Sequence, residues 1–177
     1  MMRILSFGQI TGAETPNMYS VAMVSIIKSK FHGDDQEGDF SWMLKQPHHD
    51  STLFLFNDNE GEFYKHFRGA QHTCSAGGGN AAIRPFQCLT EPRALGIPTG
   101  SYEQGPHYKG YSRLDDHVKQ VLADAFTQVE SLISTQLFTS IAFSWDDKTK
   151  LGGYIFNTAQ GVRDFIVEEI YRVAEKF

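Results

Sequence analysis

Three consecutive glycines, Gly77, Gly78 and Gly79, are the residues whose type and spacing point most directly to chemistry. Glycine adopts positive φ angles and lets another group approach the main chain closely, so several backbone N–H groups can point at one anion. The residues from Ala81 onward are compatible with a helix, whose dipole would add partial positive charge at the same place. The stretch therefore predicts a backbone cradle for a phosphate or a diphosphate.

Two other stretches follow predicted strands. The sequence Asn-Asp-Asn at residues 57–59 comes directly after the apolar run 52–56, and the Gly-Gly pair 152–153 follows the predicted strand 138–144. Taken singly, each stretch could be an ordinary turn, and residues 57–59 could close the strand as an Asx turn. In open α/β sheets, however, ligands bind beyond the carboxyl ends of the strands. The three stretches together therefore predict one ligand site.

Turnover at such a site needs a base or a water-orienting group within hydrogen-bonding distance of the reacting atoms. The candidates are Asp58, His107 and Asp146. None stands in a catalytic motif, because the sequence has no Gly-x-Ser-x-Gly, no His-Glu-x-x-His and no Walker-type lysine after the glycines. Arg84 and Arg93 could clamp a phosphate or a carboxylate, or form surface salt bridges.

Strands alternate with helices in the sequence. The strands expected are 3–7, 52–56, 94–100 and 138–144, and residues 18–31 favour a strand over a helix because they are rich in β-branched side chains. A short amphipathic piece is expected at 40–44, one or two helical turns at 62–67, and long amphipathic helices at 112–133, capped by Ser112, and 162–174. This alternation predicts a single α/β domain over residues 1–177, a three-layer α/β/α sandwich with a mostly parallel, mixed sheet.

Two loops carry residues of interest. The acidic loop 33–39 is either a solvated turn or, with carboxylates between glycines, a divalent cation site. The loop 101–110 carries Tyr102, His107 and Tyr108 and is expected to form a flap.

The composition limits the classes of protein to which the chain can belong. The chain has 177 residues and a formal net charge of -5, which argues against nucleic acid as a partner. Its two cysteines, Cys74 and Cys88, show no metal-binding or redox spacing and are expected to be reduced thiols, with no metal or other cofactor. No signal peptide or stretch of about 20 apolar residues is present. We expect a cytoplasmic protein that does not insert into membranes.

Residues 76–84 (AGGGNAAIR) resemble the first, glycine-rich loop of macro domains, and residues 140–156 resemble the strand and second, phosphate-gripping loop of that family. The resemblance implies a macro-like fold in which ADP-ribose lies across the carboxyl ends of the strands, with its diphosphate between the two loops. It implies a ligand site made of Asn57, Asn59, Gly77, Gly78, Gly79, Asn80, Gly152, Gly153, Tyr154 and Phe156, to which the Arg84 clamp would add a charge. Asp58 between the two asparagines, and Asn80 after the glycines, depart from the family pattern and put the preference for adenine in question.

A longer part of the chain, from about residue 38 to the C-terminus, also resembles an uncharacterised group of phage and bacterial proteins. Three functions remain open. The protein could bind ADP-ribose or a related nucleotide-derived ligand, it could be a hydrolase that acts on ADP-ribose derivatives or a phosphoester, or it could be a regulatory or interaction protein whose glycine loops are structural.

Overall fold

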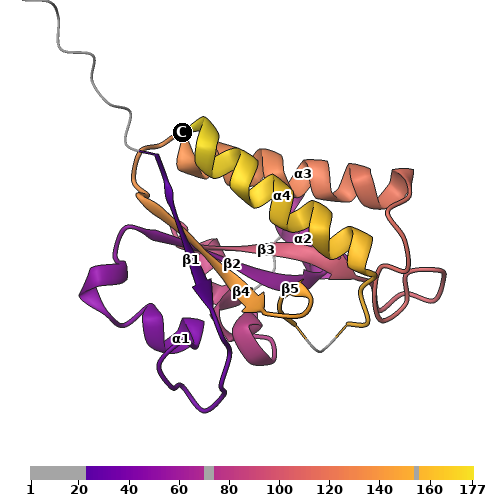
Figure 1. The fold of residues 1–177 in the computed structure, drawn as a ribbon, viewed down its shortest axis with the longest axis horizontal. Helices are drawn as coiled ribbons and strands as arrows, with labels where there is room; N and C mark the ends of the chain where they lie inside the picture. Colours follow the sequence, from indigo (N-terminus) through magenta and orange to yellow (C-terminus); the bar gives the residue numbers. More distant parts are fainter. Residues whose placement is uncertain (1–22, 70–73, 154–155) are drawn as a thin grey trace, which may run out of the picture.

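The computed structural model describes residues 23–69, 74–153 and 156–177, which form one sheet with helices on both faces (Figure 1). The strands are β1 (Ser25–Ser29), β2 (Thr52–Asn59), β3 (Ala94–Gly100), β4 (Ser140–Asp146) and β5 (Lys150–Leu151). The helices are α1 (Phe40–Met43), α2 (Glu60–Phe67), α3 (Asp116–Ile133) and α4 (Gln160–Lys176), with two 3-10 helices, η1 (Pro47–His49) and η2 (Gly79–Cys88). The predicted three-layer α/β/α sandwich is confirmed.

The sheet has the strand order β1-β4-β2-β3, and these four strands are parallel. The short β5 pairs with β4 in the antiparallel direction, which makes the sheet mixed. Leu53, Phe54, Leu55 and Phe56 of β2 are all buried, as expected for a central strand covered on both faces. Because the four long strands are parallel, their carboxyl ends meet at one edge of the sheet.

The two faces of the sheet pack against different helices. Leu53 and Leu55 point toward the larger core, which α2, α3 and α4 complete, and Figure 1 shows α3 and α4 side by side over this face. Phe54 and Phe56 point the other way, into a smaller core completed by α1 and η2. Because successive side chains of a strand point to opposite faces, one apolar run contributes side chains to both cores.

The structure tests three predictions about the ends and types of individual helices and strands. Helix α3 is capped by Asp115, whose Oδ1 accepts a hydrogen bond from the Val118 N–H at 3.1 Å, so the predicted cap at Ser112 is wrong. Ser112 Oγ instead donates to the Pro106 carbonyl. The segment after the glycines is a 3-10 helix rather than an α-helix, and it contains Pro85. Within residues 18–31 the strand prediction is confirmed for β1, whereas residues 3–7 lie outside the described part of the chain.

The prediction that both cysteines are reduced thiols is contradicted, because Cys74 and Cys88 are joined by a disulfide. Their separation of 14 residues gave no local signal, and it is the path of the chain around η2 that brings their Cα atoms to 6.2 Å. Among the described helices, none has the length and apolar character required to cross a lipid bilayer.

Candidate functional site

A cavity of about 300 Å³ lies where the carboxyl ends of the four parallel strands meet. Each strand contributes to its lining: residues 30–32 follow β1, Asn57 lies on β2, Thr99 on β3, and residues 144–146 on β4. Two glycine-containing loops and one arginine of α4 complete the wall, through Gly78, Gly79, Asn80, Ala81, Gly152, Gly153, Phe156, Thr158 and Arg163. The predicted meeting of the three stretches at one edge is therefore found in the structure.

The first glycine loop presents unused backbone donors. The Gly77 N–H donates to the Ala81 carbonyl at 2.9 Å, and the Ala81 N–H donates to the Gly78 carbonyl at 3.1 Å. Over the described residues, no acceptor is found for the N–H groups of Gly78, Gly79 and Asn80. Gly79 has φ +58°, a conformation in which glycine is favoured. Three consecutive donors on the cavity wall can bind an anion.

The Asn80 side chain fixes this loop. Its Oδ1 accepts from the Phe40 N–H at 3.1 Å, and its Nδ2 donates to Ser144 Oγ at 2.7 Å. These two bonds join the loop to the start of α1 and to the end of β4. The Asn80 amide therefore positions the loop, and its backbone is the part left for a ligand.

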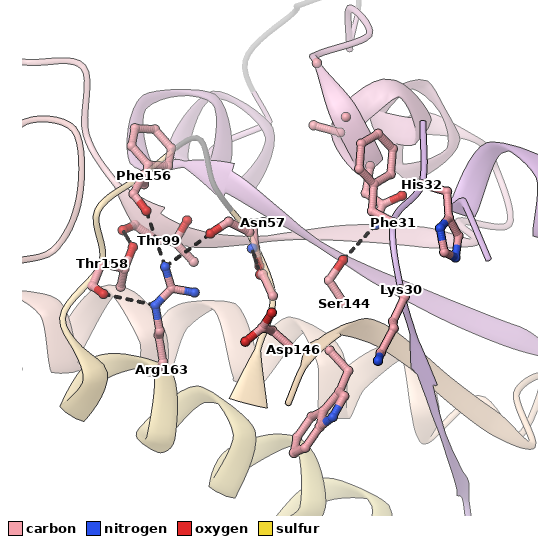
Figure 2. Close-up of a pocket in the computed structure, with 17 residues that line it drawn as sticks. Lys30, Phe31, His32, Asn57, Thr99, Ser144, Asp146, Phe156, Thr158 and Arg163 are labelled. Atoms are coloured by element: carbon pink, nitrogen blue, oxygen red, sulfur yellow. Dashed lines mark hydrogen bonds between the residues drawn. The ribbon is translucent and has the colours of Figure 1, made fainter. Parts of the chain in front are cut away.

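The second glycine loop is held by Asn57 and Arg163. Asn57 Nδ2 donates to the Gly152 carbonyl at 2.5 Å. The Arg163 guanidinium, 8 % exposed, donates to carbonyls on both sides of the loop, and Figure 2 shows it beneath Thr158 and Phe156. The acceptors are the carbonyl oxygens of Leu151 (2.6 Å), Thr158 (3.0 Å), Gly153 (3.1 Å) and Phe156 (3.4 Å). These four hydrogen bonds fix the guanidinium at the wall of the cavity.

The opposite end of the cavity follows β1. Figure 2 places Lys30, Phe31 and His32 at this end, away from Arg163. The Phe31 ring is 46 % exposed, and the Lys30 ammonium pairs with Asp147 at 2.7 Å. An exposed aromatic ring here offers a surface on which a flat ring of a ligand could stack.

Asp39 fixes the path of the chain after β1. Its buried carboxylate accepts hydrogen bonds from the N–H groups of His32, Gly33 and Gln36, at 2.6, 3.0 and 2.9 Å. Burial alone would raise the pKa of Asp39, but these donors outweigh it and hold the pKa below its usual value. Of the two interpretations of the acidic loop, these bonds support the turn.

Asp58 and Arg84, predicted as a catalytic group and a ligand clamp, are not in the cavity lining. Asp58 is 2 % exposed, and its carboxylate pairs with Arg84, with Nε to Oδ2 at 3.0 Å and Nη2 to Oδ1 at 2.5 Å. Burial alone would lower the pKa of Arg84, but the Asp58 carboxylate raises it above its ordinary value. The structure uses the pair to join β2 to η2.

Other candidates also have structural contacts. Asn59 caps α2 by accepting from the Glu62 N–H at 2.9 Å, and Gly77 lies behind the loop against Ala81 and Arg84. His107 is buried outside the cavity, with its Nε2 3.2 Å from Asp115. Tyr154 lies outside the described residues.

Asp146 is the one catalytic candidate that lines the cavity. Its Oδ1 accepts from the N–H groups of Lys148 and Thr149, both at 2.9 Å, so this oxygen also shapes the turn between β4 and β5. Tyr102 of the expected flap is 57 % exposed, and its ring centroid lies 5.2 Å from that of Phe156. Arg93 is not among the lining residues: it donates to the carbonyls of Leu44 and His49 and forms a salt bridge with Asp50, at 3.8 Å.

Sequence reasoning missed several lining residues, namely Lys30, Phe31, His32, Ala81, Thr99, Ser144, Trp145, Thr158 and Arg163. Most of them follow or end strands whose bounds were uncertain. Arg163 had a detectable signal, since it falls within the apolar stripe of α4 between Val162 and Ile166, which are both buried. A charged residue inside such a stripe requires partners at that place.

No protein-family model matches the sequence, and no match is found among curated proteins or among solved structures.

Proposed function

We propose that this protein binds ADP-ribose or a related nucleotide-derived ligand, with the diphosphate between the two glycine loops. The observation that carries the proposal is the free N–H groups of Gly78, Gly79 and Asn80 on one side of a cavity whose other side contains the Arg163 guanidinium. Backbone donors and a buried cation acting from two sides suit an anion with several oxygens.

The shape of the cavity supports a ligand longer than phosphate. Aromatic rings lie at both ends, Phe31 beyond β1 and Phe156 beside Arg163 (Figure 2). In the proposed arrangement one ring stacks with the nucleobase, and the distal ribose lies at the other end near Asn57 and Thr99. The glycine loops between them then contact the phosphates.

The positions of the three catalytic candidates favour binding over hydrolysis. Asp58 is enclosed with Arg84, and His107 contacts Asp115 outside the cavity. Asp146 remains as the group that would orient a water molecule if the ligand is turned over. The proposed activity is therefore recognition, and Asp146 is the residue to test for turnover.

Isothermal titration calorimetry with ADP-ribose, ADP, AMP and NAD tests the proposal. We expect ADP-ribose and ADP to bind at least about tenfold more tightly than AMP, because AMP lacks the second phosphate that would use both loops. At a concentration 100 times its dissociation constant, ADP-ribose should add about 2.7 kcal/mol of stability, which raises Tm by roughly 5–11 °C in a domain of this size. Equal, weak binding of all four would contradict the proposal.

Chromatography of each mixture separates binding from turnover. Unchanged ADP-ribose after prolonged incubation supports a binding protein. If products form, Asp146→Asn should abolish them while leaving the affinity for ADP-ribose within about threefold. If no phosphate compound binds, the glycine loops are structural and the interaction-protein alternative is favoured.

A further inference from the structure

A second cluster of reactive side chains lies behind the first glycine loop. His66 near the end of α2, Cys74 before the loop and Cys88 at the end of η2 each place one ligand atom within 4.8 Å of the others. The distance from Cys88 Sγ to His66 Nδ1 is 3.8 Å. Cys74 is fully buried and Cys88 is exposed, so the cluster runs from the interior to the surface.

We propose that, once the disulfide is reduced, Cys74, Cys88 and His66 bind Zn²⁺. Two thiolates and one imidazole are ligands that zinc prefers, at about 2.3 Å for sulfur and about 2.0–2.1 Å for nitrogen. The three ligand atoms lie within 4.8 Å of one another, and reduction of the disulfide lets the two sulfurs move apart to the separation that a tetrahedral ion requires. A fourth ligand can come from solvent, because Cys88 borders a surface hollow of about 360 Å³.

The disulfide and the metal exclude each other. A dithiol reductant such as dithiothreitol gives two electrons and two protons to the Cys74–Cys88 bond and is itself oxidised to a cyclic disulfide. Each cysteine thiol then loses its proton when it binds zinc, so one Zn²⁺ displaces two protons from the thiol form. The two oxidation states of the cysteines thus become two different crosslinks of the same segment.

The position of the cluster gives it a consequence for the ligand cavity. Cys74 and Cys88 bracket the segment that carries Gly78, Gly79 and Asn80. Gln87 Nε2 lies 3.7 Å from Cys74 Sγ and can support a thiolate there. Zinc would fix both ends of the segment and add a connection to α2, whereas the reduced, metal-free chain has neither crosslink.

The experiment compares the oxidised and reduced full-length chain in zinc titrations with a chromophoric chelator as competitor. We expect the reduced chain to bind one Zn²⁺ and the oxidised chain to bind none above background. Co²⁺ added to the reduced chain should give a thiolate-to-cobalt charge-transfer band in the near ultraviolet. Equal zinc binding by the two forms, or a Co²⁺ spectrum without this band, would overturn the proposal.

Variants locate the site. Cys88→Ser and His66→Gln should each weaken zinc binding at least about tenfold, while His48→Gln, at an exposed histidine of η1, should leave it unchanged. Circular dichroism checks that each variant is folded, and if Cys88→Ser is not, His66→Gln alone decides. Zinc affinity that is unchanged in folded His66→Gln would contradict the assignment, and these titrations are independent of ADP-ribose binding.

Discussion

Two arginines are buried in the described part of the chain, Arg84 and Arg163; both are 8 % exposed, and yet they have different surroundings. Arg84 of η2 forms a bidentate pair with the Asp58 carboxylate. Arg163 of α4 donates to four backbone carbonyls around the second glycine loop. The first arrangement is an ion pair outside the cavity lining, and the second ties a guanidinium at the wall of the cavity to the backbone of a glycine loop.

This difference distinguishes an arginine with a structural role from an arginine that can contact a ligand. Arg84 and the Asp58 carboxylate bind each other, so neither residue can bind a ligand unless the pair is broken. Arg163 organises its loop through backbone carbonyls and lines the cavity, so an anion bound there would lie beside its guanidinium. The comparison predicts that Arg84 variants lose mainly stability and that Arg163 variants lose mainly affinity.

The largest expected effect is on stability, from Arg84→Met. This change leaves the Asp58 carboxylate buried without its partner, and removing one member of a buried pair typically costs about 3–5 kcal/mol. Urea unfolding measures the loss. The double variant Asp58→Leu/Arg84→Met should recover more than half of it, and a double variant as unstable as the single one would show that the pair is not the cause.

Arg163 is tested by two replacements. Arg163→Lys keeps the charge but loses the planar fork, so we expect a loss of about 1–3 kcal/mol in stability and a severalfold loss of affinity for ADP-ribose. Arg163→Met also removes the charge and should weaken ADP-ribose at least about tenfold more than Arg163→Lys. Calorimetry measures the affinities, and equal affinities of the two variants would mean that the charge of Arg163 plays no part in binding.

Asp39 is a buried carboxylate that is held by backbone N–H groups, much as the Arg163 guanidinium is held by backbone carbonyls. Its folded-state pKa lies below the unfolded value, so its contribution to stability is present above about pH 4 and is lost as the pH falls through the folded pKa. Asp39→Asn should therefore cost about 1 kcal/mol at pH 7 and less as the solution is acidified. Unfolding curves from pH 7 to pH 3 check this, and a pH-independent difference would contradict it.

Much of the fold could be predicted from the sequence because its signals are local. The apolar run of β2 and the helical spacing of α3 depend on neighbouring residues alone. Strand β2 begins at Thr52 as expected but continues through residues 57–59, which were predicted to follow it, and α3 ends at Ile133 as expected. The edge of the sheet at which the site lies followed from a general rule for parallel strands. The start of α3 was wrong by a few residues because Ser112 and Asp115 are both acceptable caps.

The roles of individual site residues could not be predicted, because they depend on which way a side chain points. Asn57, Asp58 and Asn59 are consecutive, yet the first lies at the cavity, the second pairs with Arg84 and the third caps α2. The Cys74–Cys88 disulfide depends on contacts made after the chain has folded. No local pattern encodes such pairings.

If the first glycine loop binds the phosphates, Gly78→Glu must bind ADP-ribose much more weakly than the parent protein. A side chain at Gly78 meets no atom within 4 Å, so the fold should be retained while the added carboxylate repels the ligand. Gly161→Glu is a matched control, because Gly161 is equally open and lies outside the cavity lining. We predict at least a hundredfold loss of affinity for Gly78→Glu and less than a threefold change for Gly161→Glu. A folded Gly78→Glu variant that binds ADP-ribose as tightly as the parent protein would show that the first glycine loop does not bind the phosphates.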